Sequence, residues 1–524
     1  MPDAHSLWAE QAWIDGRWQA QVLLDIDAQG RWQRISPDVH TPPAWGRKRR
    51  NRDATKTRRR SQDHARPGAS AGRRHGPFLL SRPWARHPRF GAVLALGRHA
   101  DRQGREDDPG PEVPYDGNVV VIGAGASGLY AADILKAKGI QVSILEAGNQ
   151  IGGRVKSLRN QKDLVNISAA DFPVELGAEV VYGSDSIWGT NLKNFKVNTL
   201  DIGSISTDRY IMDSVSKTRD DWQIDGDFAN AQSFVDGLPD FSGSGTVAQA
   251  SAGLSNRVKA LVNSQIGNLY GTSNEKLGIA GVAEALKARI YDNQKLVLKT
   301  NPMQDFLIFR FDQVRELVQL NTQVTAIDAT GEKIIITDAN GGQIEATKVI
   351  VTVPLSILKK NVISFSPGLP SAMTSSMSRI GMDHSIRVVM DFKKNFWGAS
   401  TGFLWGGTSF PNCYSAGVGR GEFNQTLSIT INGPKAVELS ALGADMINVI
   451  LAELDSIYGG QATQFVRRDL DTGNVLFIIQ DWGKEEFIQG GYSYPMATAT
   501  LADRENLGLP IGEKIFFAGE ATDI

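Results

Sequence analysis

The sequence predicts an α/β protein in which helices cover a parallel β-sheet. A short apolar run at residues 119–122 indicates a buried strand, an apolar-periodic stretch at 129–138 indicates a helix, and a second apolar run at 141–145 indicates another buried strand. Strand, helix and strand in this order form the βαβ unit from which parallel sheets are built. Because 524 residues exceed what one ordinary hydrophobic core holds, we expect two or more domains.

The turn after the first strand carries the glycine pattern of a dinucleotide site. Gly123 would make the tight turn, Gly125 would let a pyrophosphate approach the backbone, and Gly128 would let the helix pack on the strand. The helix N-terminus, at Ala126 and Ser127, offers free N–H groups and a positive dipole end to the phosphates. The pattern predicts a Rossmann-type domain and leaves open whether the nucleotide is NAD or FAD.

The residues that follow the second strand point to a flavin. Glu146 ends that strand, where its carboxylate can accept both ribose hydroxyls. Glu146 and Ala147, followed by Gly152, Gly153 and Arg154, make this region resemble the flavin amine oxidase family, which includes monoamine and polyamine oxidases, lysine-specific histone demethylases and L-amino acid oxidases. The resemblance implies FAD, with the Gly-Gly-Arg segment running past the ribose to the pyrophosphate and the flavin.

The resemblance continues, in the family's order, over residues 118–524. Residues 172–179 resemble the second flavin-contacting segment, residues 490–495 with the preceding Trp482 resemble the family's aromatic signature, and residues 515–522 resemble its last flavin segment. The family also implies that Val324 meets the adenine side and that the strand ending at Pro354 returns beside the cofactor. The cofactor residues implied are therefore Gly123, Gly125, Ala126, Ser127, Gly128, Glu146, Ala147, Gly153, Arg154, Gly177, Ala178, Glu179, Val324, Pro354, Gly519 and Glu520.

The resemblance also implies the domain organisation, a GR2-like amine oxidase fold. In this fold a Rossmann-type FAD-binding domain is interleaved with an α+β substrate domain. The expected divisions are a disordered or fusion-derived segment at 1–112, FAD-binding parts at 113–204, 316–355 and 476–524, and substrate-domain parts at 205–315 and 356–475.

The implied chemistry is oxidation of a C–H bond next to an amine, with transfer of a hydride equivalent to the flavin, hydrolysis of the imine, and reduction of O₂ to H₂O₂. Trp482 and Tyr492 match the family's aromatic positions, whose faces can hold a neutral amine over the flavin. Arg387 stands where the family has a Lys near the flavin. An Arg is permanently charged and cannot act as a tunable base. The expected catalytic residues are Arg387, Trp482 and Tyr492.

Two departures from the family pattern affect the cofactor. Covalent members carry a flavin-linking Cys where this chain has Gly491, and the single cysteine, Cys413, lies elsewhere, so we expect non-covalent FAD. The family continues past the last flavin segment into a helix over the flavin, whereas this sequence stops at Ile524. The sequence therefore predicts a truncated FAD-binding domain. One cysteine also excludes an internal disulfide framework.

The substrate class stays open at this point. L-amino acid oxidases place an Arg after the second flavin segment to hold a carboxylate, and this chain has Ala178, Glu179 and Val180 there. Glu179 favours a cationic amine, or it is a structural acid satisfied by backbone N–H groups. Amine oxidation is therefore the favoured activity. The alternatives are an L-amino acid oxidase for an aromatic amino acid such as tryptophan, and a truncated fusion product with weak or no catalysis.

Bulk properties exclude other classes. The net charge of −1 provides no argument for a nucleic-acid partner, and no metal site is predicted. The sequence has no run of about 18 apolar residues that would span a membrane and no signal peptide at its start, so we expect a cytoplasmic protein. The expected partners are a small amine and O₂.

The first 112 residues differ in composition from the rest. Residues 1–40 alternate, with Val22, Leu24 and Ile26 on one face, and resemble the first strands of amidohydrolases such as formimidoylglutamate deiminase. Residues 41–112 show no sustained period, and between Arg47 and Arg105 there are 18 basic residues and three acids. We expect this stretch to be largely irregular, as an out-of-frame or fused piece of a GC-rich gene. A basic nucleic-acid arm is the alternative.

Overall fold

The computed structural model describes three strands near the N-terminus and residues 115–158, 174–289, 291–421 and 424–523. The chain divides into two compact units, residues 1–83 and 84–524. In the first unit, β1 (His5–Ile14), β2 (Arg17–Ile26) and β3 (Trp32–Ser36) form an antiparallel sheet. These three strands agree with the alternation predicted for residues 1–40. The disorder or basic arm expected at 41–112 lies outside the described residues.

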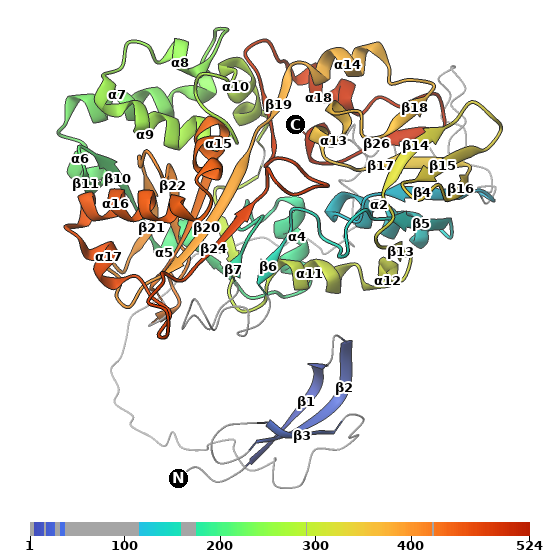
Figure 1. Ribbon diagram of the computed structural model, residues 1–524, viewed down its shortest axis with the longest axis horizontal. Coiled ribbons are helices and arrows are strands. Elements are labelled where there is room, and N and C mark those ends of the chain that lie inside the picture. The colour runs from blue at the N-terminus through green and yellow to red at the C-terminus, as the bar shows by residue number, and fades with distance from the viewer. Residues whose placement is uncertain are drawn as a thin grey trace, which may run out of the picture. The chain divides into compact units, whose positions relative to one another are not determined.

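The second unit is built on a five-stranded parallel sheet. Its order is β13 (Val318–Gln319), β5 (Gln141–Leu145), β4 (Asn118–Ile122), β17 (Lys348–Val351) and β26 (Ile515–Phe517). These strands come from three distant parts of the sequence and meet on the right of Figure 1. Val119, Val120 and Val121 in β4 are completely buried, as expected for a parallel sheet covered on both faces. Helix α2 (Ala126–Ala137) follows β4 and begins before the periodic stretch that predicted it.

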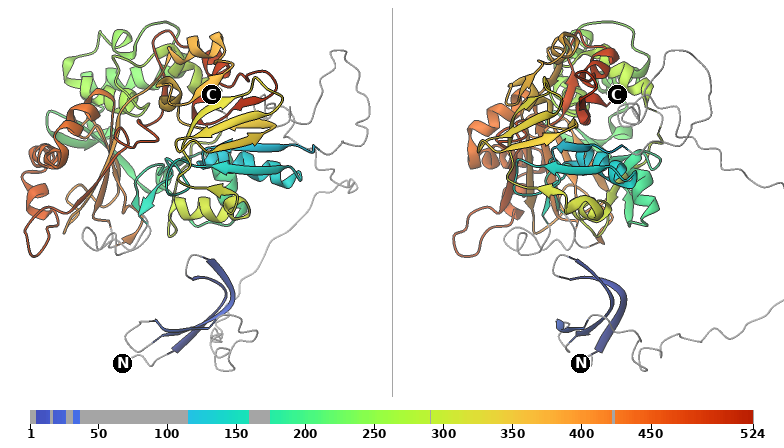
Figure 2. Two further views of the ribbon diagram at one scale, coloured as in Figure 1. Left: turned by 45° about the vertical axis from the view of Figure 1, so that its right-hand side comes forward. Right: turned by 90° about the vertical axis from the view of Figure 1, so that its right-hand side faces the viewer.

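A four-stranded sheet lies beside this one. Its order is β16 (Gln343–Ala346), β15 (Ile334–Asp338), β14 (Val324–Asp328) and β18 (Ser364–Ser366). A tight turn at residues 339–342 joins β15 to β16 in a hairpin. Figure 2 shows these yellow strands next to the cyan strands β4 and β5. Apolar side chains from both sheets form one core.

A seven-stranded sheet forms the other half of the second unit. Its order is β11 (Val215–Thr218), β10 (Thr207–Met212), β21 (Thr401–Trp405), β22 (Asn412–Ser415), β23 (Thr426–Asn432), β20 (Ser385–Asp391) and β24 (Phe477–Asp481). One face packs on α15 (Gly433–Ala441), α16 (Met446–Tyr458) and α17 (Gln461–Phe465). The opposite face packs partly on α7 (Gly226–Asp236), α9 (Lys259–Asn263) and α10 (Ile279–Ala288), the green helices of Figure 1.

One helical region is broken into short pieces. Apolar residues recur with a helical period over residues 247–266, but the chain forms α8 (Val247–Ala250), the 3₁₀-helix η6 (Asn256–Val258), α9 and the π-helix η7 (Ser264–Asn268). Gly253 disfavours a helix, and the Ser255 side chain starts η6 by accepting a bond from the Arg257 N–H. Helix α10 follows at Ile279–Ala288. Residue 290 itself lies outside the described residues.

The remaining elements connect these sheets. They are β6 (Ser157–Leu158), β7 (Val174–Glu175), β8 (Val181–Tyr182), α4 (Ile187–Asn194), β9 (Thr199–Asp201), α5 (Ile202–Ile205), α6 (Arg219–Trp222), η5 (Leu238–Asp240), β12 (Lys295–Leu298), α11 (Met303–Arg310), α12 (Asp312–Arg315), α13 (Leu355–Lys359), α14 (Ser371–Met377), β19 (Ile380–Met382), η9 (Gly443–Asp445), β25 (Ser493–Pro495), α18 (Leu501–Leu507) and η10 (Glu520–Thr522). None of the helices in the described part of the chain has the length and apolar character needed to span a membrane.

Candidate cofactor and substrate cavity

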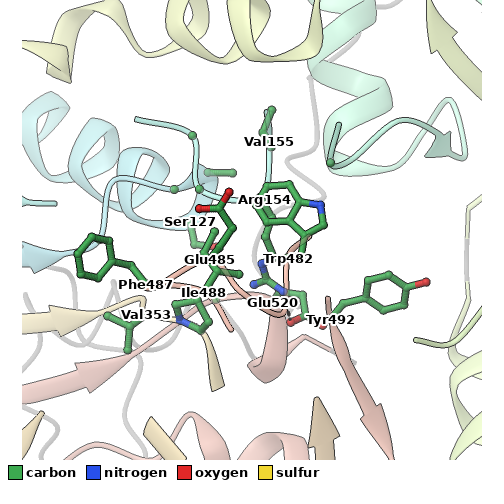
Figure 3. Close-up of a pocket in the computed structure, with 18 of the residues that line it drawn as sticks. Ser127, Arg154, Val155, Val353, Trp482, Glu485, Phe487, Ile488, Tyr492 and Glu520 are labelled. Atoms are coloured by element: carbon green, nitrogen blue, oxygen red, sulfur yellow. Dashed lines mark hydrogen bonds and ion pairs between the residues drawn. The ribbon is translucent and has the colours of Figure 1, made fainter. Parts of the chain in front are cut away.

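A cavity of about 1200 Å³ runs between the parallel sheet and the seven-stranded sheet. The last residues of four parallel strands line it, namely Ile122, Leu145, Val351 and Phe517. Ligands of open α/β sheets bind outside the carboxyl ends of the strands, so this position is the one expected for a nucleotide. Figure 3 shows Phe487 and Val353 on one side of the close-up and Tyr492 on the other.

The glycine turn between β4 and α2 leaves room for a phosphate. A Cβ atom added to Gly125 would meet no atom within 4 Å, whereas one added to Gly128 would lie 2.0 Å from the Gly123 carbonyl oxygen. Gly125 therefore opens onto the cavity, and Gly128 allows close helix–strand packing. Helix α2 has no side-chain cap, so the N–H groups of its first turn are left for an anion at Ala126 and Ser127.

Glu146 is held in place by backbone donors. One carboxylate oxygen accepts a hydrogen bond from the Ala124 N–H at 2.7 Å, and the other accepts one from the Gly148 N–H at 2.8 Å. Each oxygen has a further lone pair, and Glu146 and Ala147 line the cavity. The carboxylate is thus oriented and can still accept the two hydroxyls of a ribose.

Arg154 and Glu520 join three segments that are far apart in the sequence. The Arg154 guanidinium donates to the Gly491 carbonyl at 2.9 Å and to the Glu520 carboxylate at 3.0 Å. Glu520 also accepts bonds from the Ser493 N–H and hydroxyl at 2.9 and 2.7 Å. Burial alone would raise the pKa of Glu520, but Arg154 and the Ser493 bonds outweigh it and lower the pKa. The group therefore stays ionised and fixes this end of the cavity.

Glu179 and Arg387 form an ion pair in the cavity wall. Their side chains are 9% and 12% exposed, and the Arg387 Nη1 lies 2.5 Å from the Glu179 carboxylate. Arg387 also donates to the Ser428 hydroxyl and to the Gly177 carbonyl, both at 2.9 Å. Glu179 is thus a paired acid, but its partners are Arg387 and Ser428 and not the backbone N–H groups considered from the sequence. Neither charge is left free for a ligand.

Trp482 and Tyr492 line the same cavity and are both held by hydrogen bonds. The Trp482 indole donates to the Leu176 carbonyl at 2.9 Å, and the Tyr492 hydroxyl donates to the Leu269 carbonyl at 2.8 Å. The Asn432 amide donates to the Tyr492 hydroxyl at 3.1 Å. Burial raises the pKa of Tyr492, so its phenol stays neutral. In Figure 3 the two rings lie near Arg154 and Glu520.

The cavity brings together nearly all residues predicted from the sequence. Ala178, Gly153, Val324, Pro354 and Gly519 line it with those described above, and only Gly128, predicted for packing, does not. Residues 172 and 173, at the start of the second flavin segment, lie outside the described residues. Sequence reasoning missed several lining residues: Tyr182, Asn268, Leu269, Phe403, Asn412, Tyr414 and Thr430.

Comparison with known proteins finds family matches in two parts of the chain. Residues 301–523 match the model of flavin containing amine oxidoreductases, and residues 121–193 match that of NAD(P)-binding Rossmann-like domains. Residues 301–523 thus carry the signature of the flavin-containing amine oxidoreductase family. The family model covers the part of the chain that supplies Val324, Arg387, Tyr492 and Glu520, and the Rossmann-like model covers the glycine turn and Glu146.

Individual relatives are distant. Lysine-specific histone demethylase 1 homolog 3 of Arabidopsis thaliana is 25% identical over 515 residues, covering 83% of this chain and 30% of the relative. Polyamine oxidase 2 of the same plant is 22% identical, and the match covers 77% of this chain and 83% of the relative. Human lysine-specific histone demethylase 2 is 22% identical, and the match covers 79% of this chain and 51% of the relative. This chain therefore spans less than two thirds of the length of both demethylase relatives.

Solved structures show the same fold. A putrescine oxidase bound to putrescine superposes with a TM-score of 0.64 at 18% identity, and cyclohexylamine oxidase from Brevibacterium oxydans IH-35A with 0.63 at 20% identity. Each covers 78% of this chain and 94% of the compared chain.

The family implies FAD, and the cavity fits it. The open space at Gly125, the free N–H groups of α2 and the oriented Glu146 carboxylate suit a pyrophosphate and a ribose. Across the described ranges, no group of three His, Cys, Asp or Glu side chains could hold a metal ion.

Proposed function

We propose that this protein oxidises a small amine at the carbon next to nitrogen, using non-covalent FAD and O₂. When bound, FAD takes up the hydrogen and electron pair of that C–H bond, water hydrolyses the imine to a carbonyl compound and ammonia or an amine, and O₂ is reduced to H₂O₂. One observation carries the proposal. A single cavity connects the nucleotide features at Gly125 and Glu146 with the aromatic side chains of Trp482 and Tyr492.

The aromatic side chains would position the amine. Trp482 and Tyr492 are each fixed by a hydrogen bond, so their faces keep one orientation while a substrate binds. Aromatic faces attract the nitrogen end of an amine, and their bulk excludes water from the reacting carbon. Because the Tyr492 phenol stays neutral, it would set the path of the amine without taking its proton.

The ion pair favours an amine over an amino acid. An L-amino acid oxidase needs a free cation for the substrate carboxylate. Arg387 lines the cavity, but Glu179 neutralises it at 2.5 Å. A second carboxylate would have to compete with this partner and with the Ser428 and Gly177 contacts. We therefore assign Arg387 to shaping the cavity with Glu179 and not to carboxylate binding.

Neither of the two positions considered for a covalent bond to the flavin, Gly491 and Cys413, suits one, which supports non-covalent attachment. Gly491 lines the cavity and has no side chain. Cys413 is completely buried in the apolar core on the opposite face of the seven-stranded sheet. Its thiol, whose pKa burial raises, stays protonated there and is a poor nucleophile.

The test begins with the absorbance spectrum of the purified full chain, supplemented with FAD and then desalted. Flavin bands that acid precipitation releases into the supernatant are expected, followed by anaerobic bleaching with a panel of aliphatic and aromatic amines, and peroxide release in air. A folded protein that retains no flavin would overturn the proposal and support the truncated product. Bleaching by L-tryptophan or L-phenylalanine alone would replace it with the amino-acid oxidase.

A further inference from the structure

The seven-stranded sheet presents a polar row to the cavity. Trp405, Asn412, Thr430, Arg387 and Gln480 are paired in register across β21, β22, β23, β20 and β24. Residues directly opposite one another in an antiparallel sheet point to the same face. Asn412, Thr430 and Arg387, the middle three, all line the cavity. Their neighbours in sequence point the other way, since Cys413, Ile429 and Val388 belong to the core beneath α15–α17.

Two members of this row, Asn412 and Thr430, have no side-chain partner. By contrast, Arg387 is bonded to Glu179, and Gln480 donates to the Glu485 carboxylate. The Asn412 amide and the Thr430 hydroxyl make no hydrogen bond to any other described residue, although Asn412 is only 7% exposed. Both groups line the cavity, so a ligand that fills this part of it can pair with them and gains affinity by doing so.

The surroundings set the character of that occupant. The rings of Phe403 and Tyr414, which lie opposite each other in register, also line the cavity, with centroids 5.2 Å apart. Tyr414 is two residues beyond Asn412 on the same face of β22, so an aromatic wall borders the polar row. The charges of Arg387 and Glu179 cancel one another. This part of the cavity thus combines apolar walls with neutral hydrogen-bonding groups.

The polar row is linked to the aromatic end of the cavity. The Asn268 amide donates to the Thr430 carbonyl at 3.0 Å, and the carbonyl of the next residue, Leu269, accepts the Tyr492 hydroxyl. Asn412 lies one strand beyond Thr430 and two strands from Arg387, which places its backbone about 10 Å from that of Arg387. Tyr492 and the polar row thus line one cavity and share the Asn268–Leu269 segment, with Asn412 on the strand beyond Thr430.

We propose that Asn412 and Thr430 bind a neutral hydrogen-bonding group, a hydroxyl or a carboxamide, at the end of the substrate remote from the oxidised amine. The inference rests on the proposed amine oxidation and names its substrate class: amines with an apolar chain and an uncharged polar tail. Asn412 can donate to and accept from such a tail, and Thr430 can do the same from the neighbouring strand. A plain alkyl tail would leave both groups unpaired.

The test compares four amines that share one six-carbon chain: hexylamine, aminohexanol, aminohexanamide and diaminohexane. With the FAD-loaded enzyme, kcat/KM for the hydroxyl and amide probes is expected to exceed that for hexylamine by about 10- to 100-fold. Asn412→Leu and the isosteric Thr430→Val should each reduce this preference to within about threefold. Thr337→Val is the matched control, since Thr337 is a half-buried strand residue outside the cavity. It should leave the preference unchanged.

Binding of hexanamide, which has no amine to oxidise, gives a second readout through the change in flavin absorbance. The dissociation constant should rise about tenfold in Asn412→Leu and in Thr430→Val. Equal kcat/KM for all tails, a preference that survives both substitutions, or a preference for diaminohexane would overturn the subsite. If no amine reduces the flavin, the proposed function fails, and hexanamide binding still decides whether Asn412 and Thr430 recognise a neutral polar group.

Discussion

Replacing Glu179 by Gln tests the role of the ion pair in the cavity wall. The change removes one charge and keeps the side-chain shape, so Arg387 remains as a cation that is 12% exposed and has only neutral acceptors, Ser428 and the Gly177 carbonyl. Removing one partner of a buried pair costs about 3–5 kcal/mol, and because Gln can still accept a hydrogen bond we expect about 3 kcal/mol. The thermal midpoint should fall by roughly 3–6 °C.

The same substitution should change what the cavity binds. A released guanidinium can make charge-assisted hydrogen bonds to a carboxylate, each worth about 1.5–3 kcal/mol. Hexanoate should therefore bind Glu179→Gln about 10- to 100-fold more tightly than it binds the parent, while the binding of hexanol stays the same. Titrations followed by flavin absorbance measure both dissociation constants.

A double-mutant cycle separates charge from shape. Arg387→Gln leaves the Glu179 charge without its partner and should strengthen the binding of diaminohexane. The double variant with Glu179→Gln and Arg387→Gln is neutral again, so it should not bind hexanoate more tightly than the parent does. The reasoning is refuted if Glu179→Gln keeps the thermal midpoint of the parent and binds hexanoate no better, because the pair would then neither stabilise the fold nor mask the arginine.

Three further predictions follow from single contacts. Gly125→Val should fold but bind FAD at least about tenfold more weakly, because its side chain enters the open space at the helix N-terminus. The control is Gly226→Val, at another glycine with open surroundings, and it should keep the flavin absorbance bands. Tyr492→Phe removes the bond to the Leu269 carbonyl and should lower the free energy of unfolding by about 1 kcal/mol. Because the phenol stays neutral, the substitution should add no new ionisation to the pH profile of amine oxidation below pH 10, as stopped-flow flavin reduction can check. Burial raises the pKa of Glu175 from 4.5 to about 7, so its contribution to stability is complete below pH 4.5 and is lost as pH rises through 7. The free energy of unfolding of the parent should therefore fall by as much as about 3 kcal/mol between pH 5 and 8. Glu175→Gln should abolish this fall, which urea unfolding at each pH measures.

The nucleotide end of the site was predictable because its information is local. Gly123, Gly125, Gly128 and Glu146 lie within one βαβ unit, where strand, turn and helix directly fix their positions. The family resemblance then supplied the distant segments in order. It could not supply their contacts, such as the bond between Arg154 and Glu520, because these depend on strands separated by hundreds of residues meeting in one sheet.

The substrate end was only partly visible. Residues 426–432 alternate threonine, serine and asparagine with leucine and isoleucine, a pattern that indicates a strand with one polar face. The pattern does not say that this face meets a cavity instead of water. That follows only from the neighbours of β23 and from the helices that close the cavity. The broken helix at 247–268 shows the same limit, since its π-helical end supplies Asn268 beside the cavity.

The two faces of the seven-stranded sheet separate the residues proposed to recognise the substrate from those that form the core. Cys413, Ile429 and Val388 point into the core beneath α15–α17, where a cavity-forming substitution costs several kcal/mol. Asn412, Thr430 and Arg387 alternate with them and face the cavity. If the polar row binds the substrate tail as proposed, changes in it would alter the accepted tail without disturbing the core. Charge would have to be changed in pairs, because removing one partner of the Arg387–Glu179 pair leaves the other charge uncompensated. On this proposal, an amine-oxidising framework could change its substrate through residues that its core does not need.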